Sequence, residues 1–94
     1  MPPDPANEVQ DRIRAAAKAR RLALNIPQAD LARRAGVPLP TLKRFEQSGE
    51  VALATLLRIA GALDALDGFG ALFPPAAGSG TPPGRQRARG PAGK

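Results

Sequence analysis

Two short stretches bounded by Pro and Gly constrain the fold of this chain more than any other feature. The first runs from Pro27 to Ala35 and stops before Gly36, and the second runs from Leu39 to Gln47 and stops near Ser48-Gly49. Pro suits the first turn of a helix, and Gly suits the left-handed residue that ends one. The segment therefore predicts two helices of about nine residues joined by a tight turn.

A longer helix is expected before these two. The stretch from Pro5 or Asn7 to Leu24 is rich in Ala, has no internal Gly or Pro, and carries acidic residues near its start, all of which favour a helix. Asn7 is the expected N-cap. Asn25, which tolerates the left-handed conformation, is expected to end the helix.

Two further helical segments are expected towards the C-terminus. Ala52 to Leu63 places apolar residues at helical spacing, and Gly68 to Phe73 predicts a last short turn or helix that Pro74 stops. The last apolar residues are expected to close the core, with a dimer or partner surface as the alternative: Leu66, Phe69, Leu72 and Phe73. No segment shows the alternating pattern of a strand, so the sequence predicts an all-α fold of five helices.

Composition sets the boundaries of the domain. Pro and Gly, 11 and 10 residues, are concentrated near the two ends, and no large apolar residue follows Phe73. Such ends bury too little surface to offset the entropy lost on ordering. We therefore expect a disordered N-terminus over residues 1–6, one folded domain over residues 7–73, and a disordered basic tail over residues 74–94. Arg85 to Gly90 either lies along nucleic acid or only aids solubility.

Several function classes are excluded by composition. The chain has no Cys and no His, which removes structural zinc, disulfides, thiol catalysis and the commonest general base. Four carboxylates lie near the end of the second short helix or after it, and their spacing shows no pairing for acid–base catalysis: Glu46, Glu50, Asp64 and Asp67. We expect no enzyme, no catalytic or metal residues and no cofactor. No apolar run reaches the length of a membrane span, so a cytoplasmic protein is expected.

The charge is unevenly distributed. The net charge is +6, and between Arg12 and Arg44 nine basic residues stand against the single acid Asp30. A polyanion-binding face in this half of the domain is one interpretation, and solvated helix faces are the other. Charge alone does not separate them.

The two short helices and their turn form a helix-turn-helix unit, in which the second helix lies in the DNA major groove. Ala32 is small where the helices are expected to cross, and Gly36 accepts the positive φ of the turn. Four apolar side chains are expected to be buried between the helices: Leu31, Val37, Leu42 and Phe45.

Three runs of sequence carry a family resemblance: QADLARRAGV from Gln28, TLKRFE from Thr41 and TLLRIA from Thr55. Over about residues 9–73 the chain resembles the Cro/C1-type (XRE) helix-turn-helix family. The resemblance implies a lambda-repressor-like domain of five helices and a DNA-binding transcriptional regulator, most simply a repressor associated with the nucleoid.

The C-terminal part of the domain is more similar to HipB-like antitoxins than to phage repressors, because LATLLRIA from Leu53 is followed by a closing Leu72-Phe73-Pro74. This implies an alternative function, an antitoxin that binds a toxin partner and regulates its own operon. RNA binding is a weaker hypothesis, because the three aromatic residues are all Phe and form no stacking platform.

The resemblance also implies roles for individual residues. Gln28 is expected to contact a phosphate, and Arg21 and Glu46 are expected to form a structural pair between the first and third helices. The residues expected to face or approach the major groove are Leu39, Pro40, Thr41, Lys43 and Arg44. Arg33 and Arg34, like Lys43, are expected to attract phosphate or simply to be solvated.

The start of the recognition helix departs from the family pattern. Pro38-Leu39-Pro40 stands where polar residues are usual, and these side chains offer only apolar contact, for instance with a thymine methyl. Specificity is therefore expected to depend on Arg44 reading a guanine and on DNA shape. A two-fold dimer on double-stranded DNA is expected, with its interface within residues 57–73.

Overall fold

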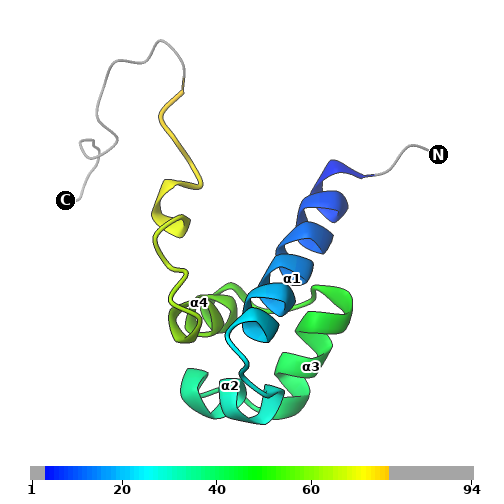
Figure 1. Ribbon diagram of the computed structural model, residues 1–94. Coiled ribbons are helices and arrows are strands. Elements are labelled where there is room, and N and C mark those ends of the chain that lie inside the picture. Colours follow the sequence, from blue (N-terminus) through cyan, green and yellow to red (C-terminus); the bar gives the residue numbers. More distant parts are fainter. Residues whose placement is uncertain (1–3, 77–94) are drawn as a thin grey trace.

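The computed structural model describes residues 4–76. They form the helices α1 (Pro5–Ala23), α2 (Gln28–Ala35), α3 (Leu39–Ser48) and α4 (Leu53–Ala62), followed by the short 3₁₀ helix η1 (Phe69–Ala71) (Figure 1). The predicted all-α class is confirmed, since the described residues contain no strand. The last short turn or helix expected over residues 68–73 is a single 3₁₀ turn, so α4 is the last α-helix among the described residues. The basic tail lies almost entirely outside the described residues.

Helix α1 begins earlier than the predicted N-cap. Asp4 is the N-cap, and its side chain accepts a hydrogen bond from the Ala6 amide at 3.0 Å. Pro5 occupies the first helical turn, where its missing N–H costs nothing. The prediction that Asn7 caps the helix is therefore wrong, because Asn7 lies inside it. At the other end Asn25 takes the expected left-handed conformation, with φ of 60°.

The turn between α2 and α3 is a left-handed helix ending. Gly36 has φ of 71°, and the Val37 amide donates to the Ala32 carbonyl at 3.0 Å. No atom would lie within 4 Å of a Cβ added at Gly36. The need for Gly here comes from the backbone conformation and not from crowding.

The core lies among α2, α3 and α4. Leu31, Leu42, Phe45 and Ile59 are almost completely buried, and Val37 joins them as expected. Helix α2 packs on α3 and α4, and α1 packs on α3. Among the apolar side chains of α1, only Ala17 is partly buried and packed against the core. Val9 and Ile13 in its N-terminal half remain 50% and 37% exposed.

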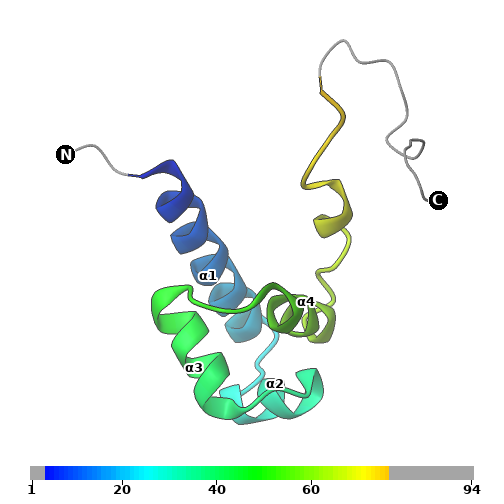
Figure 2. The same ribbon diagram turned by 180° about the vertical axis from the view of Figure 1, so that it is seen from behind.

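The molecule consists of a compact base with two projecting arms. Helices α2, α3 and α4 form the base, and the N-terminal half of α1 and the segment after α4 leave it on the same side (Figures 1 and 2). Phe69 is half-buried, but Leu66, Leu72 and Phe73 are exposed. The expectation that these three residues close the core is therefore wrong, because the second arm points away from it.

Candidate nucleic-acid interface

A buried ion pair joins α1 to α3. Arg21 donates through Nε to Glu46 Oε2 at 2.7 Å and through Nη2 to Glu46 Oε1 at 2.9 Å. Its Nη1 donates to the Ile26 carbonyl at 2.9 Å. Both residues are buried, with 7% and 4% of their surface exposed. A bidentate pair of this kind fixes orientation as well as distance, so it holds α3 in a defined position against α1.

Gln28 extends this pair to the start of α2. Its Nε2 donates to Glu46 Oε1 at 3.0 Å, and because an amide nitrogen carries two hydrogens, one N–H is left for another acceptor. Gln28 lines a shallow polar hollow together with Lys18, Lys43 and Gln47. Gln28 thus lies beside two lysines. It is also the first residue of α2, and the free backbone amides of that first turn favour an anion.

Helix α3 presents a stripe of exposed side chains at helical spacing. Pro40, Lys43, Arg44 and Gln47 are all exposed, and residues three and four apart share one side of a helix. Leu39 and Thr41, which were also predicted to face the groove, are half-buried, and Leu39 packs against the core. Only part of the Leu39 side chain is therefore free for a contact with DNA.

Gln47 was missed as a site residue. The spacing from Lys43 and Arg44 contained the signal, because a residue four or three positions later continues the same stripe. We name these four residues, Pro40, Lys43, Arg44 and Gln47, the reading stripe.

Arg44 is paired with an acid beyond the end of its helix. Its Nη2 and Nε both donate to Glu50 Oε1, at 2.6 and 3.1 Å. The two side chains are 72% and 59% exposed, so this is a surface pair worth little in stability. Arg44 can leave it when a stronger partner is present. Glu50 sits beside the reading stripe, a position that sequence spacing did not indicate.

Besides the buried Arg21, two further arginines counted in the basic half donate to backbone carbonyls of the fold. Arg14 donates to the Glu46 carbonyl at 3.2 Å, near the end of α3. Arg20 donates to the Leu63 and Asp64 carbonyls at 2.6 and 2.9 Å, at the end of α4. A cation is favourable where helix carbonyls lack partners. These carbonyls are 32, 43 and 44 residues away along the chain, so no spacing in the sequence indicated the contacts.

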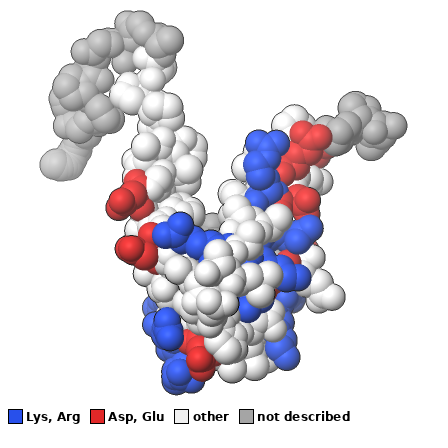
Figure 3. Space-filling view, in the orientation of Figure 1, with Lys and Arg blue, Asp and Glu red and all other residues white. Residues whose placement is uncertain are grey.

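The remaining basic side chains are available at the surface. Arg33 is paired with Asp30 at 3.0 Å but is mostly exposed, and Arg34, Lys18 and Lys43 are exposed. Figure 3 shows Lys and Arg side chains around the end of the molecule that α2 and α3 occupy. After the internal arginines are set aside, the positive charge still lies near the reading stripe.

A family comparison agrees with this geometry. A family model described as helix-turn-helix matches residues 18–67, which include the end of α1, all of α2, α3 and α4, and the turn that Gly36 makes. The chain belongs to the Cro/C1-type helix-turn-helix family. It is thus a DNA-binding regulator of this type. No curated protein matches the chain significantly.

The Cro/C1-type domain accounts for the two best-defined parts of the site. In a helix-turn-helix unit the second helix of the unit reads the major groove and the first crosses the DNA backbone. Helices α3 and α2 hold these two positions in the matched segment. Within residues 4–76, no helix of this domain combines the length and the apolar character that crossing a bilayer requires.

Proposed function

We propose that this protein is a sequence-specific repressor that places α3 in the major groove of double-stranded DNA. The observation that carries the proposal is the reading stripe on a helix whose buried face is fixed by Arg21, Glu46 and Gln28. A helix held in this way presents its exposed side chains in one orientation. Discrimination between bases requires that fixed geometry.

Contacts with phosphate position the domain. Gln28 has a free N–H beside the first turn of α2, and Lys18 and Lys43 line the same hollow. This combination of amide donors and two cations suits one phosphate of the backbone. Arg33 on the exposed side of α2 adds attraction without specificity.

Contacts with base edges supply specificity. Arg44 reads a guanine through its N7 and O6 acceptors, after it leaves Glu50. Gln47 is suited to adenine, because an amide pairs with the N6 and N7 groups of that base. Pro40, with the exposed part of Leu39, packs against a thymine methyl, and Thr41 supports these contacts from the half-buried side of the stripe.

Selection of bound duplexes from a random pool tests this proposal. We expect enrichment of one sequence that contains a guanine in each half and is symmetric about its centre, because two copies of the domain bind two half-sites one helical turn apart. A pool that shows no enrichment after repeated rounds would contradict sequence-specific binding. A strongly enriched site with no symmetry would contradict the paired arrangement.

The antitoxin role remains the alternative function. It requires a surface for a toxin partner, and the exposed Leu66, Leu72 and Phe73 of the second arm are the observation in its favour. Purification from the native host separates the two functions. A stoichiometric protein partner would support the antitoxin, and a protein that purifies without one would support a simple repressor.

A further inference from the structure

An open apolar groove runs along the inner side of α1. One hollow of about 300 Å³ lies between the start of α1 and the loop before α4, and Val9, Ile13, Leu53 and Leu56 are among its lining residues. A second hollow of about 190 Å³ continues from it, because Ile13 and Leu56 line both. We call the two hollows together the α1–α4 groove.

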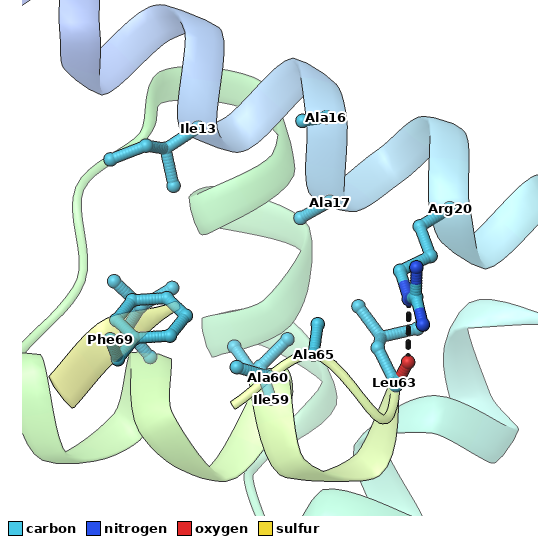
Figure 4. Close-up of a pocket in the computed structure, with 10 residues that line it drawn as sticks. Ile13, Ala16, Ala17, Arg20, Ile59, Ala60, Leu63, Ala65 and Phe69 are labelled. Carbon is cyan, nitrogen blue, oxygen red and sulfur yellow. Dashed lines mark hydrogen bonds between the residues drawn. The ribbon is translucent and has the colours of Figure 1, made fainter. Parts of the chain in front are cut away.

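The deeper part of the groove is shaped by both arms. Figure 4 shows Ile13 and Ala17 of α1 facing Phe69 and Ala60 across the hollow. Arg20 closes one end, and its guanidinium is held by the Leu63 carbonyl at 2.6 Å. The lining is almost wholly apolar, so the groove favours an apolar side chain over a charged or hydrated one.

The second arm carries apolar side chains that are not buried within their own chain. Phe73 is 95% exposed, and Leu72 and Leu66 are exposed by about half. Figure 1 shows this arm running alongside the N-terminal half of α1 but apart from it. Each chain therefore displays both an apolar groove and an apolar projection that does not enter it.

The composition of residues 77–94 does not suit the groove. Residues 77–94 contain no Val, Leu, Ile, Met or Phe and are made of Pro, Gly, Ala, Ser, Thr, Gln, Arg and Lys. Small and basic residues gain little from an apolar site, and burying their charge is unfavourable. The last large apolar residue before the end of the chain is Phe73 itself.

We propose that two copies of this chain form a dimer in which Leu72 and Phe73 of each copy enter the α1–α4 groove of the other. In a two-fold dimer the same groove and the same projection are used twice. Including Val9, Ile13, Leu53 and Leu66, the exposed apolar side chains offer on the order of 500 Å² per chain. Two copies then bury about 1,000 Å², the size at which specific interfaces begin.

The proposal deepens the paired binding of half-sites proposed above and moves the expected interface. The dimer surface was expected within residues 57–73, whereas the proposed interface also includes α1, through Val9 and Ile13. The reading stripe lies on α3, which contributes only Phe45 to the lining of the groove. Dimerisation and DNA binding therefore use different side chains, and each can be tested without the other.

Sedimentation equilibrium of the full chain without DNA tests the dimer, with Phe73→Ser and Val9→Glu as variants. Phe73 and Val9 are exposed in the single chain, so neither change disturbs its fold. We expect a dimer for the unchanged chain and a dissociation constant raised roughly 100-fold or more by each variant, because each change acts twice in the dimer. Leu22→Ser, an equally exposed position on α1 away from the groove, should leave the constant unchanged.

A mixture of the two variants tests the exchange itself. In a mixed dimer the intact Phe73 of the Val9→Glu chain meets the intact groove of the Phe73→Ser chain, so one of the two contacts is restored. We expect the mixture to associate more tightly than either variant alone. A monomeric unchanged chain, or a dimer that survives both variants, would overturn the proposal, whether or not the chain binds DNA.

Discussion

Glu46 is the residue on which the orientation of α3 depends most. Its carboxylate accepts two hydrogen bonds from Arg21 and one from Gln28, so one side chain connects α1, α2 and α3. The pairing of Arg21 with Glu46 was implied by the family resemblance, and the structure places them together. The resemblance also implied that Gln28 contacts a phosphate and helps to position the recognition helix, and its hydrogen bond to Glu46 on α3 agrees with the second role.

Removal of Glu46 should destabilise the domain strongly. Glu46→Ala leaves the buried Arg21 guanidinium without its partner, and a broken buried pair costs about 3–5 kcal/mol. We expect a loss of this size in the free energy of unfolding, measured by urea denaturation. The double change Arg21→Met with Glu46→Leu removes both charges and should cost less than Glu46→Ala. An equal or larger loss in the double variant would contradict this account of the pair.

Glu50 should weaken DNA binding. It holds Arg44 by an exposed ion pair, and in the proposed complex this pair must break before Arg44 reaches a base. In that complex the negative charge of Glu50 also repels the nearby DNA phosphates. Glu50→Gln should therefore raise the affinity for the selected duplex by up to about fivefold, in line with the small energies of surface pairs. Fluorescence anisotropy at constant salt measures this effect. Asp67→Asn, in the segment between α4 and η1, also removes one negative charge and is the control. Weaker binding by Glu50→Gln would contradict the proposed competition.

Among the helices, the boundaries that depend on local backbone conformation could be predicted from the sequence. The arginine contacts with distant helix carbonyls could not. Pro27, Gly36 and Gly49 bound the two short helices because each acts on its own backbone. The inward use of Arg14 and Arg20 depends on helix ends far along the chain, which no spacing reveals. A last short turn or helix was expected over residues 68–73; Gly68 and Gly70 weaken so short a helix, and one 3₁₀ turn forms.

Any side chain at Gly36, in the turn after α2, should lower the free energy of unfolding. Gly36→Ala places a Cβ at φ of 71° in otherwise open space, so the cost is the left-handed strain alone, about 1–2 kcal/mol. Thermal and urea unfolding should both show this loss. Gly68→Ala is the matched control, because its space is also open and its φ is −77°. If the two variants unfold alike, the left-handed turn is not what requires Gly36.

In the whole molecule, the surfaces proposed for DNA recognition and for assembly occupy different regions. The base contains α3 and its fixed scaffold, and the two arms carry apolar surface that the base does not cover. The three helices of the base could be predicted from the sequence, because their buried residues follow helical spacing and Pro and Gly bound the two short helices. It could not foresee the open arms, because apolar residues such as Phe73 have the same pattern whether they close their own core or another copy's groove.

We expect Arg44 on α3 to read a guanine in the major groove. The test replaces that guanine in the selected duplex with 7-deazaguanine, which lacks the N7 acceptor, and measures the affinity of the unchanged chain and of Arg44→Ala for both duplexes. Loss of one bond of a bidentate contact should weaken the unchanged chain by roughly 1 kcal/mol, or about fivefold. Arg44→Ala should bind both duplexes equally, and inosine, which lacks only the minor-groove amino group, should leave the unchanged chain unaffected. An unchanged chain that ignores 7-deazaguanine and is weakened by inosine would contradict the claim.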